Sequence, residues 1–297
     1  MCRHRAYLGP PVTLADCVLH QPHSLLHQSW APADMRGGGT INADGFGIGW
    51  LVGDPGGDLI GVDAGVGVVA RRYRRDVPMW SDASLPDLAA SISSGAILAA
   101  VRSATAGMPV GETACAPFIE GPSMFSHNGV INGWPASVAP LAHALPTGML
   151  MTLDAPTDSA FLWAMVRVRL REGHSAARAL ASVVDEVLAL APRSRLNLLL
   201  NDGQQIAATT VSHALWFKQG EDSITVSSEP LDPGEKPWQP VPNLLLLEAT
   251  ATDYSIRPLN QGWAAPQTRD QGPPGPNRRW RPTDTTTPPT PRAPRTA

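Results

Sequence analysis

The second residue of the chain is a cysteine, within the sequence Met1-Cys2-Arg3. Removal of the initiator methionine, which is usual before a small side chain, would leave Cys2 with both a thiol and a free α-amino group. The thiol has an ordinary pKa of about 8.5, and an α-amine with a pKa of about 7.7–8.0 can take its proton, directly or through water. The sequence therefore predicts a nucleophile that carries its own base. The alternative is a frayed terminus with an inert thiol.

Three further positions have side chains suited to the same chemistry. Arg102 follows an apolar stretch at residues 96–101, and its guanidinium can bind a carboxylate through two hydrogen bonds. The pair Asn128-Gly129 offers a side-chain amide beside a glycine N–H, and these are donors that an oxyanion hole needs. Asp158 stands near the predicted start of a helix. Each position has an ordinary alternative, namely an arginine at the sheet surface, an Asn-Gly turn and a helix cap.

Two other patterns imitate binding motifs. His20, His23 and His27 have the spacing of metal ligands, but Pro22 prevents one regular helix from presenting all three. Residues 65–70 fit the G-x-G-x-x-A fingerprint of dinucleotide-binding proteins, but an arginine-rich run and a proline follow instead of the required βαβ unit. We therefore predict neither a metal site nor a dinucleotide cofactor.

Short strands and five helices are predicted around these residues. The strands are expected at residues 3–9, 46–52, 96–101, 115–119, 124–131, 195–201, 205–210, 213–217, 223–227 and 244–247, with residues 59–63 as a hairpin partner of 46–52. The helices are expected at residues 14–20, 23–30, 85–94, 158–171 and after Ser175, where apolar residues repeat with helical spacing. Residues 121–153 carry no Asp, Glu, Lys or Arg, but four prolines exclude a membrane-spanning helix there. We predict strand and loop for that stretch.

The composition narrows the class of protein. The 297 residues, 43% of them hydrophobic, suffice for one large domain or two ordinary ones. A net charge of −3 gives no reason to expect nucleic acid or a membrane surface as a partner. Three widely spaced cysteines argue against a disulfide framework, and the N-terminus has no apolar signal segment. We therefore predict a cytoplasmic protein.

The composition changes near the C-terminus. From residue 264 onward the chain has nine prolines and six arginines, and it has no Leu, Ile, Val or Phe. Such a segment cannot bury enough apolar surface to fold. We therefore predict one folded domain at residues 2–262 and a disordered tail at residues 263–297.

Cys2 is followed in order by the motifs NADGFG at 42–47, RSAT at 102–105, HNG at 127–129 and TDS at 157–159. This order resembles the class II glutamine amidotransferases, which belong to the N-terminal nucleophile hydrolases, over roughly residues 2–260. The resemblance implies an α+β fold, a four-layer αββα sandwich, and no metal or other cofactor.

The resemblance also implies a role for each matched residue. Cys2 would attack the γ-carbonyl of a glutamine-like group, while Asn128 and the Gly129 N–H hold the oxyanion. A γ-glutamyl thioester would form, and water would then release glutamate. The implied substrate-binding residues are Arg102 for the α-carboxylate, Asp158 for the α-ammonium, and also Thr105 and His127.

Within that family, residues 1–9, 23–30 and 101–105 look most like the γ-glutamyl hercynylcysteine S-oxide hydrolases of ergothioneine biosynthesis. Those enzymes remove glutamate from a γ-glutamyl conjugate. The resemblance implies a small-molecule γ-glutamyl substrate as partner and leaves a homo-oligomer open. Two features depart from the family pattern, namely Arg5, where an apolar residue is expected, and the proline-rich tail.

Three alternatives remain open on the sequence. The first is a glutaminase subunit that donates ammonia to a separate synthetase, and the second is a γ-glutamyl peptidase that acts on glutathione-like peptides. The third is a catalytically silent binding protein of the same fold. The chain after residue 264 has no room for a synthase domain that would receive ammonia, which favours a hydrolase.

Overall fold

Strand β1 (Arg3–Thr13) lies at the centre of the first of two antiparallel sheets. The computed structural model describes residues 2–34, 41–53, 67–105, 107–232 and 237–259. In these residues the first sheet has seven strands in the order β11-β9-β10-β1-β4-β2-β3. Its other members are β2 (Phe46–Val52), β3 (Val69–Arg75), β4 (Ser93–Val101), β9 (Trp216–Gln219), β10 (Ile224–Ser227) and β11 (Gln239–Pro240).

The second sheet has six strands within the described residues, in the order β13-β12-β8-β7-β6-β5. They are β5 (Phe118–Glu120), β6 (Ser123–Val130), β7 (Arg195–Asn201), β8 (Ile206–Thr210), β12 (Leu245–Ala249) and β13 (Tyr254–Pro258). The strand pairings within the described residues of both sheets are antiparallel, as the closely spaced apolar runs predict.

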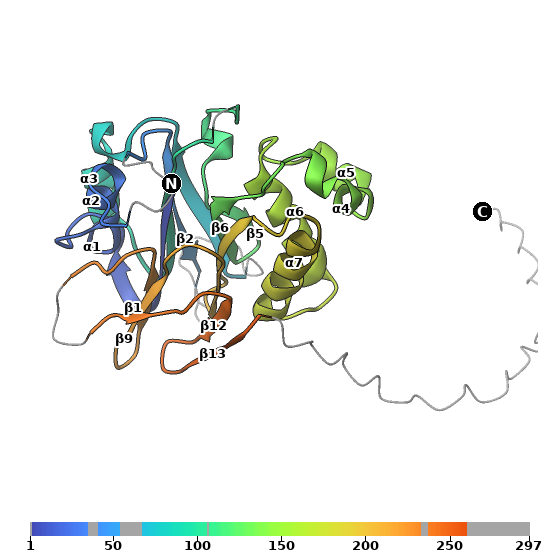
Figure 1. Ribbon diagram of the computed structural model, residues 1–297. Helices are drawn as coiled ribbons and strands as arrows, with labels where there is room; N and C mark the ends of the chain where they lie inside the picture. The colour runs from blue at the N-terminus through green and yellow to red at the C-terminus, as the bar shows by residue number, and fades with distance from the viewer. Residues whose placement is uncertain (1, 35–40, 54–66, 106, 233–236, 260–297) are drawn as a thin grey trace, which may run out of the picture. The chain divides into compact units, whose positions relative to one another are not determined.

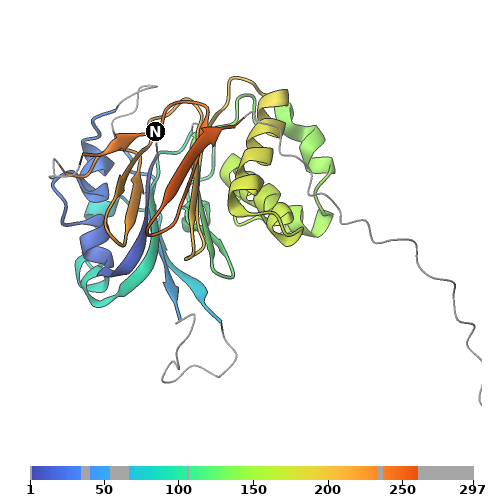
Figure 2. The same ribbon diagram turned by 90° about the horizontal axis from the view of Figure 1, so that it is seen from below.

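Helices cover the outer faces of both sheets. Helices α1 (Leu14–Val18), α2 (Leu25–Trp30) and α3 (Leu85–Ser91) lie against the first sheet, and α6 (Asp158–Arg171) and α7 (Ala176–Leu190) against the second. Figures 1 and 2 show the resulting order of helices, sheet, sheet and helices. This order confirms the four-layer αββα sandwich that the sequence predicts.

Two apolar clusters hold the layers together. The first fills the space between the sheets and includes Leu98, Leu199 and Phe217, while the second joins the first sheet to α1, α2 and α3. Side chains alternate along β1, so Ala6 enters the first cluster and Tyr7 the second. A fully buried side chain of this kind contributes about 1.5–3 kcal/mol to the free energy of unfolding.

The two long helices begin where the sequence predicts, because a hydroxyl caps each of them. The Thr157 side chain accepts a hydrogen bond from the Ala160 N–H at 3.2 Å, and the Ser175 side chain accepts one from the Arg178 N–H at 3.3 Å. Such a cap satisfies one of the N–H groups that the first helical turn leaves unpaired. The cap of α6 fixes the position of Asp158, its first residue.

Several predicted boundaries are wrong. Strand β1 continues past Gly9 to Thr13, because a register shift between Leu8 and Val12 accommodates the prolines, which cannot donate to the ladder. Residues 121–153 contain two short helices, α4 (Ala139–His143) and α5 (Thr147–Met151), where loop is predicted. Within the described residues, strand β2 pairs with β3 on one side and with β4 on the other. The predicted partner at 59–63 and the tail at 263–297 lie outside the described residues.

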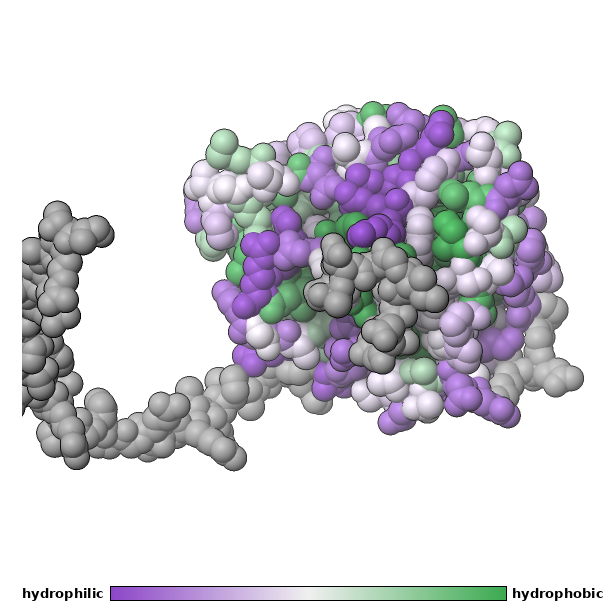
Figure 3. All heavy atoms as spheres, turned by 180° about the vertical axis from the view of Figure 1, so that it is seen from behind, coloured by the Kyte–Doolittle hydropathy of each residue, from purple (hydrophilic) through white to green (hydrophobic). Residues whose placement is uncertain are grey.

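The surface opposite to that of Figure 1 is of mixed character. Figure 3 shows hydrophilic residues gathered over the upper middle of this face, with smaller hydrophobic areas on either side. None of the helices in the described part of the chain has the length and apolar character needed to cross a bilayer.

Candidate active site

Cys2 lies where the start of β1 meets the end of β4. In the antiparallel pairing Arg3 stands opposite Val101, so the residue before β1 faces the residues that follow β4. The Ser103 N–H points to the Cys2 sulfur at 3.5 Å, and the sulfur lies 3.6 Å from the Ser103 carbonyl oxygen. The sulfur is thus held by backbone groups of a residue to which the sequence assigns no role.

Most of the predicted site residues line one cavity with Cys2. This cavity has a volume of about 330 Å³, part of it open to solvent, and brings together Cys2, Arg102, Thr105, His127, Gly129 and Asp158. Asn128, which precedes Gly129 in the chain, lines a smaller cavity with Arg3 and His213. The structure thus brings residues that lie up to 156 positions apart in the chain to one cavity, and their roles stay predictions.

Arg102 presents a free donor in this cavity. Its backbone is held by a hydrogen bond from its N–H to the Gly45 carbonyl at 2.8 Å, and its Nη2 donates to the Pro109 carbonyl at 2.8 Å. Its Nη1 is buried and has no hydrogen-bond partner among the described residues. A guanidinium in this state can bind an incoming carboxylate.

Asp158 presents a fixed carboxylate. Its Oδ2 accepts from the Ile131 N–H at 3.0 Å and its Oδ1 from the Ser159 N–H at 2.8 Å. The Ser159 hydroxyl lies 3.4 Å from Oδ1 as a third, longer contact. An ionised carboxylate has about four acceptor positions, so capacity for a cation remains. The start of α6 stabilises the negative charge, because the helix dipole is positive there. The capping role itself belongs to Thr157, so the alternative of Asp158 as a cap is wrong.

Asn128 and Gly129 lie inside strand β6, paired with Asn197 and Leu196 of β7. The alternative of an Asn-Gly turn is therefore wrong. A side chain at Gly129 would overlap the carbonyl oxygen of Arg195, so only glycine fits here. The Asn128 Oδ1 is buried and has no hydrogen-bond partner among the described residues.

His127 joins three elements. Its Nε2 lies 3.0 Å from the Arg195 carbonyl oxygen and its Nδ1 lies 3.0 Å from the Ser159 hydroxyl. Since a carbonyl only accepts, Nε2 carries a proton and donates it to Arg195, while Nδ1 and the Ser159 hydroxyl form a second hydrogen bond. Both ring nitrogens are used by the protein, which suits His127 to positioning β6 and α6 rather than to hydrogen bonding with a substrate.

A second thiol, that of Cys115, lines an adjoining cavity together with Cys2. Cys115 is fully buried, and burial raises the pKa of its thiol to about 11. Its sulfur contacts the Arg75 carbonyl oxygen at 3.4 Å. Gly45 has a φ of +116° and no room for a side chain, because one would collide with this sulfur. Cys115 therefore packs the loop before β2 and stays protonated at neutral pH.

That loop also shapes the site. The Asp44 Oδ2 accepts a hydrogen bond from the Ala104 N–H at 2.7 Å, and the Asp44 N–H donates to the Arg102 carbonyl at 3.0 Å. The loop from the NADGFG motif thus holds the segment that carries Arg102 and Ser103. This explains in physical terms why the motif accompanies the others.

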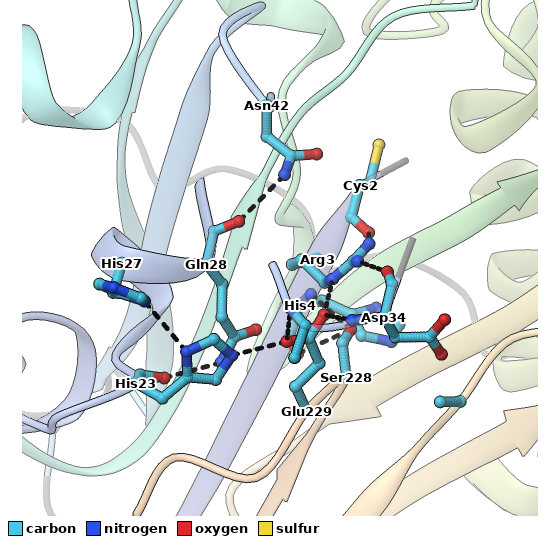
Figure 4. A network of polar contacts seen from close by, with 12 residues as sticks. Cys2, Arg3, His4, His23, His27, Gln28, Asp34, Asn42, Ser228 and Glu229 are labelled. Atoms are coloured by element: carbon cyan, nitrogen blue, oxygen red, sulfur yellow. Dashed lines mark hydrogen bonds and ion pairs between the residues drawn. The ribbon is translucent and has the colours of Figure 1, made fainter. Parts of the chain in front are cut away.

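A buried ion pair anchors the backbone of Cys2. Arg3 Nε lies 2.7 Å from Glu229 Oε1, and Arg3 Nη1 donates to the Cys2 carbonyl at 3.0 Å. Burial alone would raise the pKa of the Glu229 carboxyl, but hydrogen bonds from His23, the Ala33 N–H and Arg3 lower it to about 2. Figure 4 shows the network, with the Cys2 sulfur pointing away from it.

Of the three spaced histidines, His23 and His27 lie together and His20 lies apart. His23 Nε2 donates to Glu229 Oε2 at 2.6 Å, and its Nδ1 lies 3.0 Å from His27 Nδ1. His20 instead contacts Asp16 at the surface. Glu229, Asp44 and Ser103 contact the segments around Cys2, and the sequence gives none of them a role, because each contact joins distant parts of the chain.

Sequence comparison with known proteins shows which family the chain belongs to. No protein-family model matches the chain. The chain is 38% identical over 261 residues to the gamma-glutamyl-hercynylcysteine sulfoxide hydrolase of Mycolicibacterium smegmatis, covering 87% of this chain and 100% of the relative. It is 33% identical to the protein of the same name from Mycobacterium tuberculosis, covering 88% of this chain and 98% of the relative. The chain belongs to the family of these hydrolases.

The fold comparison agrees with this family. A glutamine aminotransferase class-II domain protein from Silicibacter pomeroyi superimposes with a TM-score of 0.58 at 23% identity, covering 87% of this chain and 99% of that one. At this identity the likeness concerns the fold. The fold of this hydrolase family is therefore that of the class II glutamine amidotransferases, as the order of motifs predicts.

Proposed function

We propose that the chain hydrolyses the γ-glutamyl amide bond of γ-glutamyl hercynylcysteine S-oxide, a step of ergothioneine biosynthesis, and releases glutamate and hercynylcysteine S-oxide. The observation that carries the proposal is the cavity in which a cysteine, an arginine with a free donor and a fixed carboxylate face one space. Arg102 and Asp158 match the α-carboxylate and α-ammonium of a glutamyl group. The names of the mycobacterial relatives support the choice of conjugate.

The reaction begins once Met1 has been removed and Cys2 has a free α-amine. The amine takes the thiol proton, and the sulfur attacks the γ-carbonyl carbon. Negative charge moves to the carbonyl oxygen, where the Asn128 side-chain amide and the Gly129 N–H donate hydrogen bonds. Such donors are effective because they are already oriented before charge develops.

The second half of the reaction uses the same groups. The C–N bond breaks as the α-ammonium of Cys2 returns the proton to the leaving nitrogen, which leaves a γ-glutamyl thioester. Water then loses a proton to the α-amine and attacks the thioester carbonyl. Glutamate departs and the thiol is restored, so no external oxidant, metal or cofactor enters the balance.

The remaining predicted residues have supporting roles in this proposal. Thr105 is exposed beside Arg102, where its hydroxyl can reach the substrate carboxylate. His127 positions the β6 segment that carries Asn128 and Gly129. The Ser103 N–H orients the Cys2 sulfur towards the cavity.

The proposal includes a compartment and a kind of partner. All three cysteines of the chain are unpaired, which suits a reducing compartment, and we place the protein in the cytoplasm with a small γ-glutamyl conjugate as its partner. That neither nucleic acid nor a membrane is a partner stays a prediction, and so does a homo-oligomer.

The test is glutamate release by the purified full chain, with Met1 removal checked by intact mass. The γ-glutamyl hercynylcysteine S-oxide conjugate, free glutamine and glutathione are compared at equal concentrations, with Cys2→Ala as control. Strong, Cys2-dependent preference for the conjugate is expected. Preference for glutamine would indicate an ammonia-donating subunit, preference for glutathione a peptidase, and either result would overturn the proposal.

A further inference from the structure

A broad hollow lies on the outer face of the first sheet, between α1 and the strands β9 and β10. It has a volume of about 1130 Å³, part of it open to solvent, and its lining includes Arg5, Tyr7, Asp16, Cys17, Lys218 and Trp238. None of its lining residues borders the Cys2 cavity. Figure 1 shows two of the elements that border it, α1 and, below it, β9.

Arg5 is the unusual residue of this hollow. Only 5% of it is exposed, and its Nε and Nη1 atoms are buried without a hydrogen-bond partner among the described residues. Arg3 lies two positions earlier on the same face of β1, yet it pairs with Glu229 at 2.7 Å. A buried guanidinium without a counter-ion is unfavourable, because it has lost water and gained nothing in return.

The carboxylates that line the hollow are engaged with other groups. Asp232 Oδ1 lies 2.9 Å from Lys218 Nζ and accepts from the Trp238 indole at 3.2 Å. Asp16 accepts from the Thr13 hydroxyl at 2.7 Å and contacts His20 at 3.0 Å. Lys218 is thus neutralised, and Arg5 remains as the cation that can attract an anion into the hollow.

The neighbour of Arg5 across the sheet is also without a partner. Ser227 of β10 stands directly opposite Arg5, so both side chains lie on the same face. The Ser227 Oγ is buried and has no hydrogen-bond partner among the described residues. The Arg5 guanidinium, which lines the hollow, and the buried Ser227 hydroxyl beside it on the same face of the sheet therefore both have unused hydrogen-bonding capacity.

We propose that this hollow binds a small monocarboxylate of about amino-acid size, with the Arg5 guanidinium as its counter-ion. The planar fork of a guanidinium matches a carboxylate through two parallel hydrogen bonds. A doubly charged phosphate fits less well, because Asp16 and Asp232 line the same hollow and only one unpaired cation faces them. The site is separate from the catalytic cavity and does not depend on the proposed reaction.

The test uses the full chain with Arg102→Met, which removes carboxylate binding in the Cys2 cavity. Isothermal titration calorimetry with glycine, acetate and inorganic phosphate measures binding elsewhere. We expect glycine and acetate to bind. We expect Arg5→Met in the same background to raise the Kd of both ligands by at least about 10-fold. Arg71→Met, the same change at an exposed arginine of β3, serves as matched control and leaves the Kd unchanged.

Folding of the variants is checked by thermal unfolding. Arg5→Met replaces an unpaired buried charge with an apolar side chain of similar length, so its Tm is expected to equal or exceed that of the parent. Ligand binding raises the Tm of the parent with concentration and leaves that of Arg5→Met unchanged. The proposal is overturned if the carboxylates give no binding, if Arg5→Met binds them equally well, or if phosphate binds more tightly.

Discussion

The Cys2 cavity and the Arg5 hollow each contain an arginine whose guanidinium is partly without partners. Around Arg102 the fold adds a fixed carboxylate, a nucleophile and a strand with a glycine that has no room for a side chain. Around Arg5 the described carboxylates, Asp16 and Asp232, are each engaged with other side chains. In both proposals the unpaired arginine attracts an anion, and the proposed catalysis needs the additional groups that, among the described residues, line the cavity with Cys2.

Replacing the two thiols near the catalytic cavity gives the largest expected difference. Cys2→Ala removes the attacking sulfur, and loss of a catalytic nucleophile lowers kcat by on the order of 10⁶-fold. Cys115→Ala removes a protonated, buried thiol, so turnover is retained with some loss of stability. Glutamate release by both variants checks this, and comparable activity in Cys2→Ala would remove the basis for the mechanism.

Asn128→Ala tests the oxyanion hole. Removing one prepared donor lowers kcat by about 10²–10³-fold, while KM changes little because the donor acts mainly on the charged intermediate. The measurement is steady-state kinetics on the conjugate. Circular dichroism and the Tm serve as controls for folding, since Asn128 lies within β6. An unchanged kcat in a folded variant would show that Asn128 does not donate a hydrogen bond to the oxyanion.

Arg102→Met tests the carboxylate clamp and sharpens the comparison between the cavities. A hydrogen bond to a charged group contributes about 1.5–3 kcal/mol, so kcat/KM falls by about 10- to 150-fold. Arg71→Met, the matched change at an exposed arginine, is expected to leave kcat/KM unchanged. Equal kinetics for both variants would show that Arg102 does not bind the glutamyl carboxylate.

The sequence predicts those parts of the site that depend on local chemistry. The start of α6 at Asp158 follows from the hydroxyl cap of Thr157, and strand β2 follows from its apolar run. The layers follow from the resemblance to a family rather than from the periodicity of single elements. The roles of Cys2, Asn128 and Arg102 rest on the same source and stay predictions.

Other parts depend on contacts that no local pattern reveals. Arg3 and Glu229 are separated by 226 positions, so their ion pair follows only from the pairing of strands. Strand β3 escapes prediction because four of its seven residues are arginines, and the edge position lets them reach solvent or Asp154. Arg5 illustrates the same limit, since its lack of a partner is a property of the folded chain.

The two regions also differ in how acid affects the free energy of unfolding, and this effect is smaller than the effects on activity. Near the Cys2 cavity, burial lowers the pKa of His4 to about 3, with further lowering by His127, His213 and Arg3. The described lining of the Arg5 hollow contains no histidine. Below its ordinary pKa of about 6.5 the unfolded chain protonates His4 while the folded chain does not. Stability is therefore full above about pH 6.5 and falls as the pH drops towards about 3.

The size of this loss can be measured by chemical unfolding between pH 7 and pH 5. For one histidine with such a shift the free energy of unfolding falls by about 2 kcal/mol over this range. His4→Gln removes the titrating group, so its stability should depend less on pH even if its stability at pH 7 is lower. His20→Gln, at a surface histidine paired with Asp16, is the matched control. An equal pH dependence in His4→Gln and the parent would show that protonation of another group causes the loss of stability. The Glu229 carboxyl, which has a pKa of about 2, is not that group, because it affects stability only below the ordinary glutamate pKa of about 4.3.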